Sequence, residues 1–238
     1  MITLYKFIII IFGKPKRLIM QSETIENYLK TIYHLSGGNG TIVNNKQLAD
    51  KLNVIPATVT EAVKKLHDLK YVIYEKSYGT RLTSLGSKTA LSIVRRHRIW
   101  ETYLANELGF GWDEVHEIAE ELEHIQNDKL IKKLSEKLGN PSFDPHGDPI
   151  PDEKGKIQKS NFIKLSEAKL KNSYKIMGVT DHSTAFLKYL EKHQLVIGAS
   201  ISIKIIEEFD NSIILICQKK EVGISPKAAE SIIVQTLL

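Results

Sequence analysis

The segment Asn45-Lys-Gln-Leu-Ala-Asp-Lys-Leu52, continued by Asn53-Val-Ile55 and Pro56-Ala-Thr-Val-Thr-Glu-Ala-Val-Lys-Lys-Leu66, decides the fold of the N-terminal part of the chain. Apolar residues recur at helical spacing on both sides of the turn, and Pro56 suits the first turn of the second helix. A short helix, a tight turn and a helix that starts with small polar residues form a helix-turn-helix. The second helix, ending near Lys70, is therefore predicted to enter a major groove of DNA.

The residues around this segment complete a winged domain. A helix is expected from an N-cap at Ser22 to Leu35, where the glycine-rich residues 37–40 end it. After the helix-turn-helix, the β-like runs Tyr71–Tyr74 and Thr80–Thr83 flank a glycine-bearing turn, which predicts a hairpin. A long helix towards Leu108 follows. The hairpin directly behind the second helix is interpreted as a wing.

Charge supports DNA as the partner of this region. Residues 46–98 hold 11 Lys and Arg against 4 Asp and Glu, whereas residues 99–155 hold 5 against 14. A single lysine is usually a solvated charge, but this concentration favours a polyanion. The side chains expected near base edges are Thr58, Thr60, Glu61 and Lys64. Those expected at phosphates are Lys65, Lys76, Tyr78 and Arg81.

The acidic region contains possible metal ligands. In His116-Glu-Ile-Ala-Glu-Glu-Leu-Glu-His124, a helix would place His116, Glu120, Glu123 and His124 on one face. Just upstream, His97 and Glu101 stand at i and i+4 of another helix. Histidines and carboxylates on helices are usually a solvated face, but two such helices in succession favour a site. Imidazole and carboxylate ligands suit manganese, ferrous iron or zinc.

The remaining sequence predicts a further helix, a loop and a β-rich domain. The helix covers Leu130–Leu138, and the proline-rich loop covers Asn140–Pro151. His146 in this loop is interpreted as structural or exposed and is left out of the metal site. From Asn161 onward, a short helix around residues 183–190 and the runs Ala199–Ile206 and Ser212–Cys217 are expected, and residues 226–234 are expected to form a closing turn or short helix.

Composition favours a globular cytoplasmic protein. The 238 residues allow two or three domains and include a single cysteine, Cys217, which is expected to be buried in a strand. The apolar run Phe7–Phe12 is too short to span a bilayer, and the lysines follow it, unlike those of a secretory signal. A translation start at Met20 is a hypothesis, which would make residues 1–19 a mis-assigned extension.

The chain resembles the diphtheria toxin repressor family of metal-dependent transcriptional regulators. The resemblance rests on residues 26–33, 57–63, 96–98, 120–124 and 146–151, on a wing similar to that of manganese-responsive members, and on a C-terminal region similar to the FeoA or SH3-like barrel. It implies a mainly α fold with small β parts: a winged helix-turn-helix over residues 20–90, a helical metal-binding and dimerisation domain over 91–157, and a small SH3-like β-barrel over 158–238.

The resemblance also assigns ligands. It places Glu120, Glu123, His124 and a side chain at position 27 in a principal site, and His97, Glu101 and His116 in an auxiliary site. Manganese regulators usually carry an acid at position 27, whereas this chain has Asn27, and Lys30 disfavours a second metal beside the first. Asp181 and His182 are only loosely aligned with possible barrel ligands.

The expected function is a homodimeric DNA-binding repressor of manganese or iron uptake genes. Binding of Mn²⁺ or Fe²⁺, with Zn²⁺ as a further possible metal, would activate the homodimer for a palindromic operator, with no enzymatic activity and no membrane partner. Two alternatives remain at this point. One is a helix-turn-helix regulator whose acidic helices are only structural. The other is a metal-dependent hydrolase, although position 120 of the zincin-like His116-Glu117 run is glutamate rather than histidine.

Overall fold

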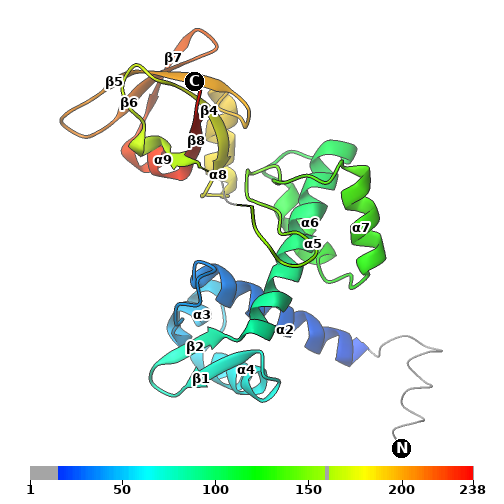
Figure 1. Cartoon of the computed structure of the whole chain (residues 1–238). Coiled ribbons are helices and arrows are strands. Elements are labelled where there is room, and N and C mark those ends of the chain that lie inside the picture. The colour runs from blue at the N-terminus through cyan, green and yellow to red at the C-terminus, as the bar shows by residue number, and fades with distance from the viewer. Residues whose placement is uncertain (1–15, 159–160, 238) are drawn as a thin grey trace, which may run out of the picture. The chain divides into compact units, whose positions relative to one another are not determined.

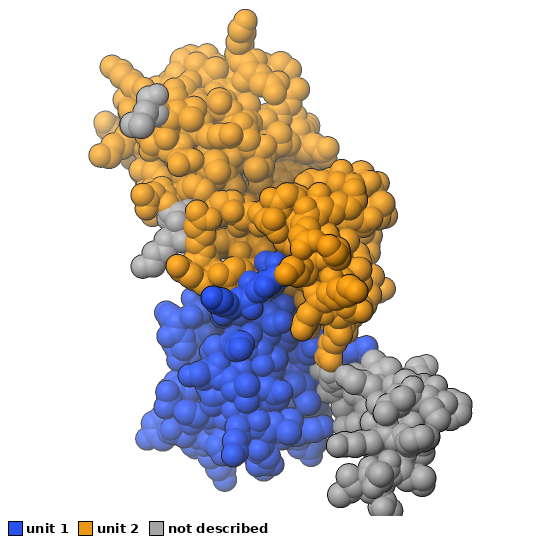
Figure 2. Space-filling model, turned by 45° about the vertical axis from the view of Figure 1, so that its right-hand side comes forward, with its two compact units in different colours: residues 1–95, 153–155 blue, residues 96–152, 156–238 orange. Residues whose placement is uncertain are grey.

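The computed structural model describes residues 16–158 and 161–237, with side chains described from residue 23 onward. The chain forms two compact units, which are coloured separately in Figure 2. Unit 1 comprises residues up to Arg95 together with Glu153–Gly155, and unit 2 comprises Arg96–Asp152 together with Lys156–Leu238. The mainly helical fold with small β parts is confirmed (Figure 1). No described helix is both long and apolar enough to cross a membrane.

Unit 1 is a winged helix-turn-helix. Its elements in chain order are α2 (Lys16–Leu35), α3 (Asn45–Leu52), α4 (Pro56–Asp68), β1 (Val72–Glu75) and β2 (Gly79–Leu82). Leu29, Leu48 and Val63 lie in its core and are fully buried. Each comes from a different helix, so the three helices share one apolar centre that fixes the angle of α4.

The start of α2 differs from the prediction. The helix begins at Lys16 rather than after Ser22, so the N-cap interpretation of Ser22 was wrong. The residues before Ser22 include leucine, methionine and arginine, which favour helix, and no proline or glycine interrupts them. Residues 1–15 of the expected extension lie outside the described residues, and the start at Met20 stays a prediction.

Local capping and turn geometry explain why α3 and α4 form a helix-turn-helix. The side chain of Asn44 accepts from the backbone N–H of Gln47, and the Gln47 side chain accepts from that of Asn44, a reciprocal capping box. Asn53 ends α3 in the left-handed conformation at φ 53°, which asparagine tolerates well. Pro56 then opens α4 without losing a hydrogen bond.

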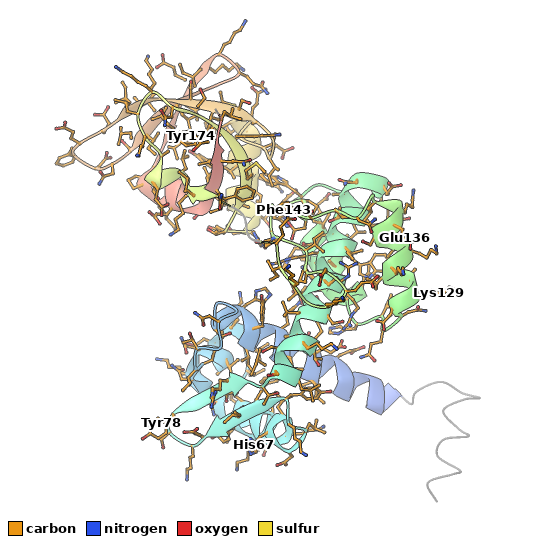
Figure 3. All side chains as sticks on the ribbon, in the orientation of Figure 1. His67, Tyr78, Lys129, Glu136, Phe143 and Tyr174 are labelled. Carbon is orange, nitrogen blue, oxygen red and sulfur yellow. The ribbon has the colours of Figure 1, made fainter. Side chains whose placement is uncertain are left out.

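The wing is attached to the helices by its second strand. β1 and β2 pair antiparallel, and Val43 and Thr80 exchange two backbone hydrogen bonds of 2.8 Å, which adds a short third strand. A Cβ atom at Gly79 would lie 2.5 Å from the Val43 carbonyl oxygen, so glycine is required at this close approach. The wing therefore has a fixed base, while its turn is exposed, with Tyr78 at the tip (Figure 3).

The helical part of unit 2 is built on α5 (Ser84–Leu108), whose first turns belong to unit 1, together with α6 (Val115–Leu122) and α7 (Asp128–Lys137). The predicted long helix towards Leu108 is confirmed. The predicted helix through His124 was wrong at its end, because α6 stops at Leu122 and Glu123 is its C-cap. Arg96 explains this ending, since its Nε donates to the Glu123 carbonyl oxygen at 2.5 Å and occupies an acceptor at the helix end.

The last part of unit 2 is a six-stranded antiparallel sheet with two helices. Its strands are β3 (Ile163–Lys164), β4 (Ser173–Val179), β5 (Ser200–Ile206), β6 (Ile213–Cys217), β7 (Lys220–Ile224) and β8 (Ile232–Thr236), in the order β3-β8-β4-β5-β6-β7. A 3₁₀ turn, η1 (Leu165–Glu167), and helices α8 (Thr184–Lys192) and α9 (Pro226–Ser231) complete it.

This sheet domain is organised around a buried apolar centre. Tyr174, Ile176 and Cys217 are all buried within it, so the prediction for Cys217 is confirmed (Figure 3 labels Tyr174). The C-terminal residues depart in part from expectation. A short helix does follow Ser225, but Ile232–Thr236 form a strand between β3 and β4. Val234, expected in the closing turn, is fully buried there because its side chain belongs to the apolar centre of this domain.

Candidate metal centre and DNA-binding surface

Helix α5 contributes the first two predicted ligands, one helical turn apart. His97 Nε2 lies 2.9 Å from Glu101 Oε1, and both side chains are buried. The other ring nitrogen, Nδ1, lies 2.7 Å from Oε2 of Glu123 at the end of α6. His97 therefore stands between a carboxylate of the predicted auxiliary site and a carboxylate of the predicted principal site.

Helix α6 contributes two further predicted ligands, His116 and Glu120. His116 Nδ1 lies 3.1 Å from Glu101 Oε1 and 3.2 Å from His97 Nε2, while its Nε2 lies 3.5 Å from Glu120 Oε1. Possible ligand atoms lie within 4.8 Å of one another in two groups, one of His97, Glu101 and His116 and one of His97, Glu120 and Glu123. The structure thus brings together five of the seven predicted ligands.

The two remaining predicted ligands are His124 and Asn27. His124 is in the turn after α6 and belongs to none of the ligand groups found among the described residues. Asn27 is on α2 in unit 1. Its Oδ1 is buried and accepts no hydrogen bond from the described part of the chain. A buried amide oxygen without a donor is costly, and a bound cation would satisfy it.

His146 belongs to this cluster, although it was left out of the predicted site. It is fully buried, with Nε2 2.6 Å from the Trp112 carbonyl oxygen, to which it donates, and Nδ1 3.6 Å from Glu101 Oε2. Its Nδ1 has no hydrogen-bond partner within residues 16–158 and 161–237. Glu101, Asp144 and His146 form a third group with possible ligand atoms within 4.8 Å.

The loop that carries His146 is held in place by Asp144 and Arg98. Asp144 Oδ1 accepts from the backbone N–H groups of His146 at 2.8 Å and Asp148 at 2.9 Å. Arg98 donates to the Pro149 carbonyl oxygen at 2.6 Å, and its guanidinium lies 3.4 Å from Asp144 and 3.3 Å from Asp148. Asp144 and Asp148 were the sequence signal that could have indicated an ordered loop around His146. An aspartate readily accepts a hydrogen bond from the backbone N–H two residues later, as Asp144 does from His146.

The barrel meets the same loop. The backbone N–H of Val179 donates to the His146 carbonyl oxygen at 2.9 Å, and a Cβ at Gly147 would lie 2.0 Å from the Met177 carbonyl oxygen. His182 stacks on His146 with ring centroids 4.7 Å apart, and its Nε2 lies 3.8 Å from Asp148 Oδ2. Asp181 instead accepts from the backbone N–H of Ser183. Of the two loosely aligned barrel residues, His182 is the one beside the cluster.

Burial and charge shift the pKa values of this cluster in different directions. Burial raises the pKa of Glu101, but the surrounding imidazoles of His116, His146 and His97 outweigh it and hold that pKa well below its usual range. Burial lowers the pKa of His146, but Glu101 and Asp144 outweigh it and raise the value to about 8. Burial, together with the charge of Glu101, raises the pKa of Asp144 to about 8. The cluster therefore favours positive charge at its centre.

The predicted DNA-reading residues lie on the exposed face of unit 1. Val59, Val63 and Leu66 turn the other face of α4 into the core, which leaves the polar positions outside. The exposed predicted residues are Thr58, Glu61, Lys64, Lys65, Lys76, Tyr78 and Arg81. They form one set on α4 and one on the wing, as binding to a groove and its flanking phosphates requires.

Thr60 differs from the other predicted reading residues. It is half-buried, and its hydroxyl donates to the Pro56 carbonyl oxygen at 3.0 Å. The same hydroxyl accepts from Asn45 Nδ2 at 3.1 Å. Its donor is therefore used inside the protein, where it ties α4 to the first turn of α3.

Comparison with protein-family descriptions covers each part of the chain. Residues 20–80 match "Iron dependent repressor, N-terminal DNA binding domain", residues 83–152 match "Iron dependent repressor, metal binding and dimerisation domain", and residues 163–236 match the FeoA domain. The three matches follow the order of the winged helix-turn-helix, the helical cluster and the sheet.

Individual similar proteins are also repressors of this kind. The iron-dependent repressor IdeR of Mycobacterium leprae is 26% identical over 209 residues, covering 87% of this chain and 82% of IdeR. The diphtheria toxin repressor of Corynebacterium diphtheriae is 30% identical over 129 residues, covering 54% of this chain and 57% of that protein.

Solved structures give the same result for the fold. A manganese-dependent transcriptional repressor in complex with manganese matches with a TM-score of 0.79 and 32% identity, covering 90% of this chain and all of that chain. The manganese regulator SloR matches with a TM-score of 0.70 and 32% identity, covering 90% and 98%. The chain therefore belongs to the diphtheria toxin repressor family of iron- or manganese-dependent, DNA-binding transcriptional repressors.

Proposed function

We propose that this chain is a cytoplasmic homodimer that binds a palindromic operator when a divalent metal occupies the cluster at α5 and α6. The observation that carries the proposal is the network of buried His97, Glu101 and Glu123 with half-exposed His116, in which imidazole nitrogens and carboxylate oxygens converge. Nitrogen and oxygen ligands without thiolate suit Mn²⁺, Fe²⁺ or Zn²⁺. The sole cysteine is buried in β6.

The proposed principal site uses Asn27, Glu120, Glu123 and His124, as the family resemblance implies. Metal bound there would select the DNA-competent state of the protein. Metal and DNA would then strengthen each other's binding by the same factor. The buried Oδ1 of Asn27, which lacks a donor among the described residues, supports this role.

The proposed auxiliary site uses His97, Glu101 and His116, to which the geometry of the loop adds His146. In the neutral imidazole, the hydrogen bond from His146 Nε2 to the Trp112 carbonyl oxygen leaves the lone pair on Nδ1. That nitrogen is the one on the side of Glu101. A cation here would be held by α5, α6 and the loop together.

A metal-independent regulator remains a second candidate, because His97 and its carboxylate partners also satisfy one another directly. Catalysis is not part of the proposal, since the relatives are transcriptional repressors. Target genes for manganese or iron uptake are proposed from the same relatives.

The test is fluorescence anisotropy of DNA from the promoter region of the protein's own gene, titrated at fixed salt. One series contains chelator, and the others contain Mn²⁺, Fe²⁺ or Zn²⁺. Tight binding only with metal supports the proposal, and the ranking of metals identifies the one sensed. Equal binding in chelator would refute metal activation and support the metal-independent candidate. Sedimentation of the same samples measures the homodimer.

A further inference from the structure

Glu61 is an acidic side chain on the exposed face of the helix expected to enter DNA. Its helix, α4, buries Val59 and Val63 and leaves Glu61 exposed beside Lys64 and Lys65. A carboxylate at such a position is repelled by the phosphates of DNA, so it weakens binding to any sequence that offers it no donor. Binding with Glu61 in the groove is therefore favourable only where a DNA base donates a hydrogen bond to the carboxylate and offsets this repulsion.

Within the described residues 16–158 and 161–237, Glu61 makes no hydrogen bond and no ion pair. Lys64, one turn further along α4, also makes none there. This contrasts with Thr60, whose hydroxyl is held by Pro56 and Asn45. Both oxygens of Glu61 are thus available to a base, whereas the Thr60 donor is not.

The chemistry of the carboxylate limits the base that it can accept. An ionised carboxylate only accepts hydrogen bonds. In the major groove guanine and thymine present no donor, whereas cytosine presents its N4 amino group and adenine its N6 amino group. In adenine the N7 acceptor lies beside N6 and repels the second carboxylate oxygen. In a base pair, N6 of adenine has an acceptor on both sides, its own N7 and O4 of the paired thymine, whereas N4 of cytosine has one on one side only, O6 of the paired guanine. Cytosine is therefore the better partner.

We propose that Glu61 is a specificity-determining residue that reads a cytosine amino group in each half of the operator. The inference rests on the proposed DNA-binding function and deepens it by naming one base. Lys64, with three donors, suits guanine acceptors near the same position. Glu61 acts chiefly by exclusion, because it admits cytosine and disfavours the other bases.

The experiment selects DNA from a pool of duplexes with randomised half-sites, in the presence of Mn²⁺, using the full-length protein. The wild type, Glu61→Gln and Glu61→Ala are compared with Glu191→Gln, which makes the same charge change on exposed α8 of the barrel. Anisotropy on the selected duplex and its single-base variants then measures discrimination at each position. Circular dichroism and Mn²⁺ binding establish that every variant is folded.

The wild type is expected to enrich cytosine at one position of each half-site and to discriminate there by about 5- to 150-fold. Glu61→Gln is expected to shift that position towards adenine, which glutamine reads with two hydrogen bonds, and Glu61→Ala to lose the preference there alone. Both variants should bind random DNA more tightly than wild type. Glu191→Gln should select the wild-type sequence.

Two results would overturn the inference while leaving the proposed function intact. One is the same selected sequence for wild type and both Glu61 variants. The other is a wild-type preference for an A·T pair, rather than a G·C pair, at every position that the Glu61 variants change. If none of the folded proteins selects any sequence, the proposed function itself fails, and the inference fails with it.

Discussion

The charged side chains of α4 and those between α5 and α6 are similar in type but opposite in surroundings. On α4, Glu61 and Lys64 are exposed and make no ion pair among the described residues. Between α5 and α6, His97 and Glu101 are buried within hydrogen-bonding distance of each other. With the proposed function, the exposed charges would stay in water until a large polyanion arrives, whereas the buried charges are already desolvated and positioned for a small cation.

The largest expected effect comes from breaking the buried set. Glu123→Ala should weaken metal-dependent DNA binding more than about 100-fold, because it removes a ligand and leaves His97 without one of its carboxylates. Anisotropy in Mn²⁺ against chelator measures this, and sedimentation tests that the dimer persists. Glu121→Ala, on the exposed side of α6, is the matched control and should behave as wild type. Unchanged metal dependence in Glu123→Ala would refute the site.

The buried set should also make stability depend on pH. The pKa of His146 is raised from 6.5 to about 8, so its contribution is fully present below pH 6.5 and is lost as pH rises through about 8. In chelator, the free energy of unfolding should fall over this range by up to about 2 kcal/mol from His146. Asp144, whose pKa burial raises to about 8, adds a loss in the same direction.

Urea unfolding at several pH values measures this dependence. His146→Asn should reduce the slope between pH 6.5 and 8, whereas His193→Asn, at the end of α8 in the barrel, should leave it unchanged. An equal slope in wild type and His146→Asn would show that His146 does not gain a proton on folding.

A smaller effect is expected from breaking the exposed set. Lys65→Ala should weaken binding about equally for all sequences and reduce the slope of log K against log salt by about 1, because Lys65 is expected to neutralise one phosphate. Lys129→Ala removes an equally exposed lysine from α7 and is the control (Figure 3). A selective loss for one sequence would instead place Lys65 at a base.

The smallest effect is expected from a change that touches neither set of charges. Asn44→Ala removes the capping box of α3 and should lower the free energy of unfolding by about 1 kcal/mol without changing the salt dependence of DNA binding. Thermal unfolding measures the first quantity and salt titration the second. An altered salt dependence would mean that Asn44 itself contacts DNA.

Sequence reasoning succeeded where short-range periodicity controls the structure. Val59, Val63 and Leu66 recur at helical spacing, so their burial and the exposure of Glu61 follow directly. The pairing of His97 with Glu101 follows in the same way, because four residues complete about one turn.

It failed where a distant residue decides the outcome. The end of α6 depends on Arg96, which is 27 residues earlier and donates to the Glu123 carbonyl oxygen. The burial of His146 depends on Trp112 and on β4, neither of which has a recognisable spacing from it. The internal hydrogen bonds of the Thr60 hydroxyl could not be foreseen either, because its partner Asn45 is on another helix, and its role in reading DNA stays a prediction. Such contacts are properties of the tertiary fold and leave no local pattern.

The close approach of Gly147 to Met177 has a consequence for the evolution of this chain. Because a single methyl group at Gly147 would collide with the backbone of β4, the barrel and the His146 loop cannot diverge independently. The barrel is therefore not an optional appendage whose loss would leave a smaller but equivalent regulator. Without the barrel, the loop would lose the hydrogen bond from Val179 to the His146 carbonyl oxygen and the His182 ring stacked on His146.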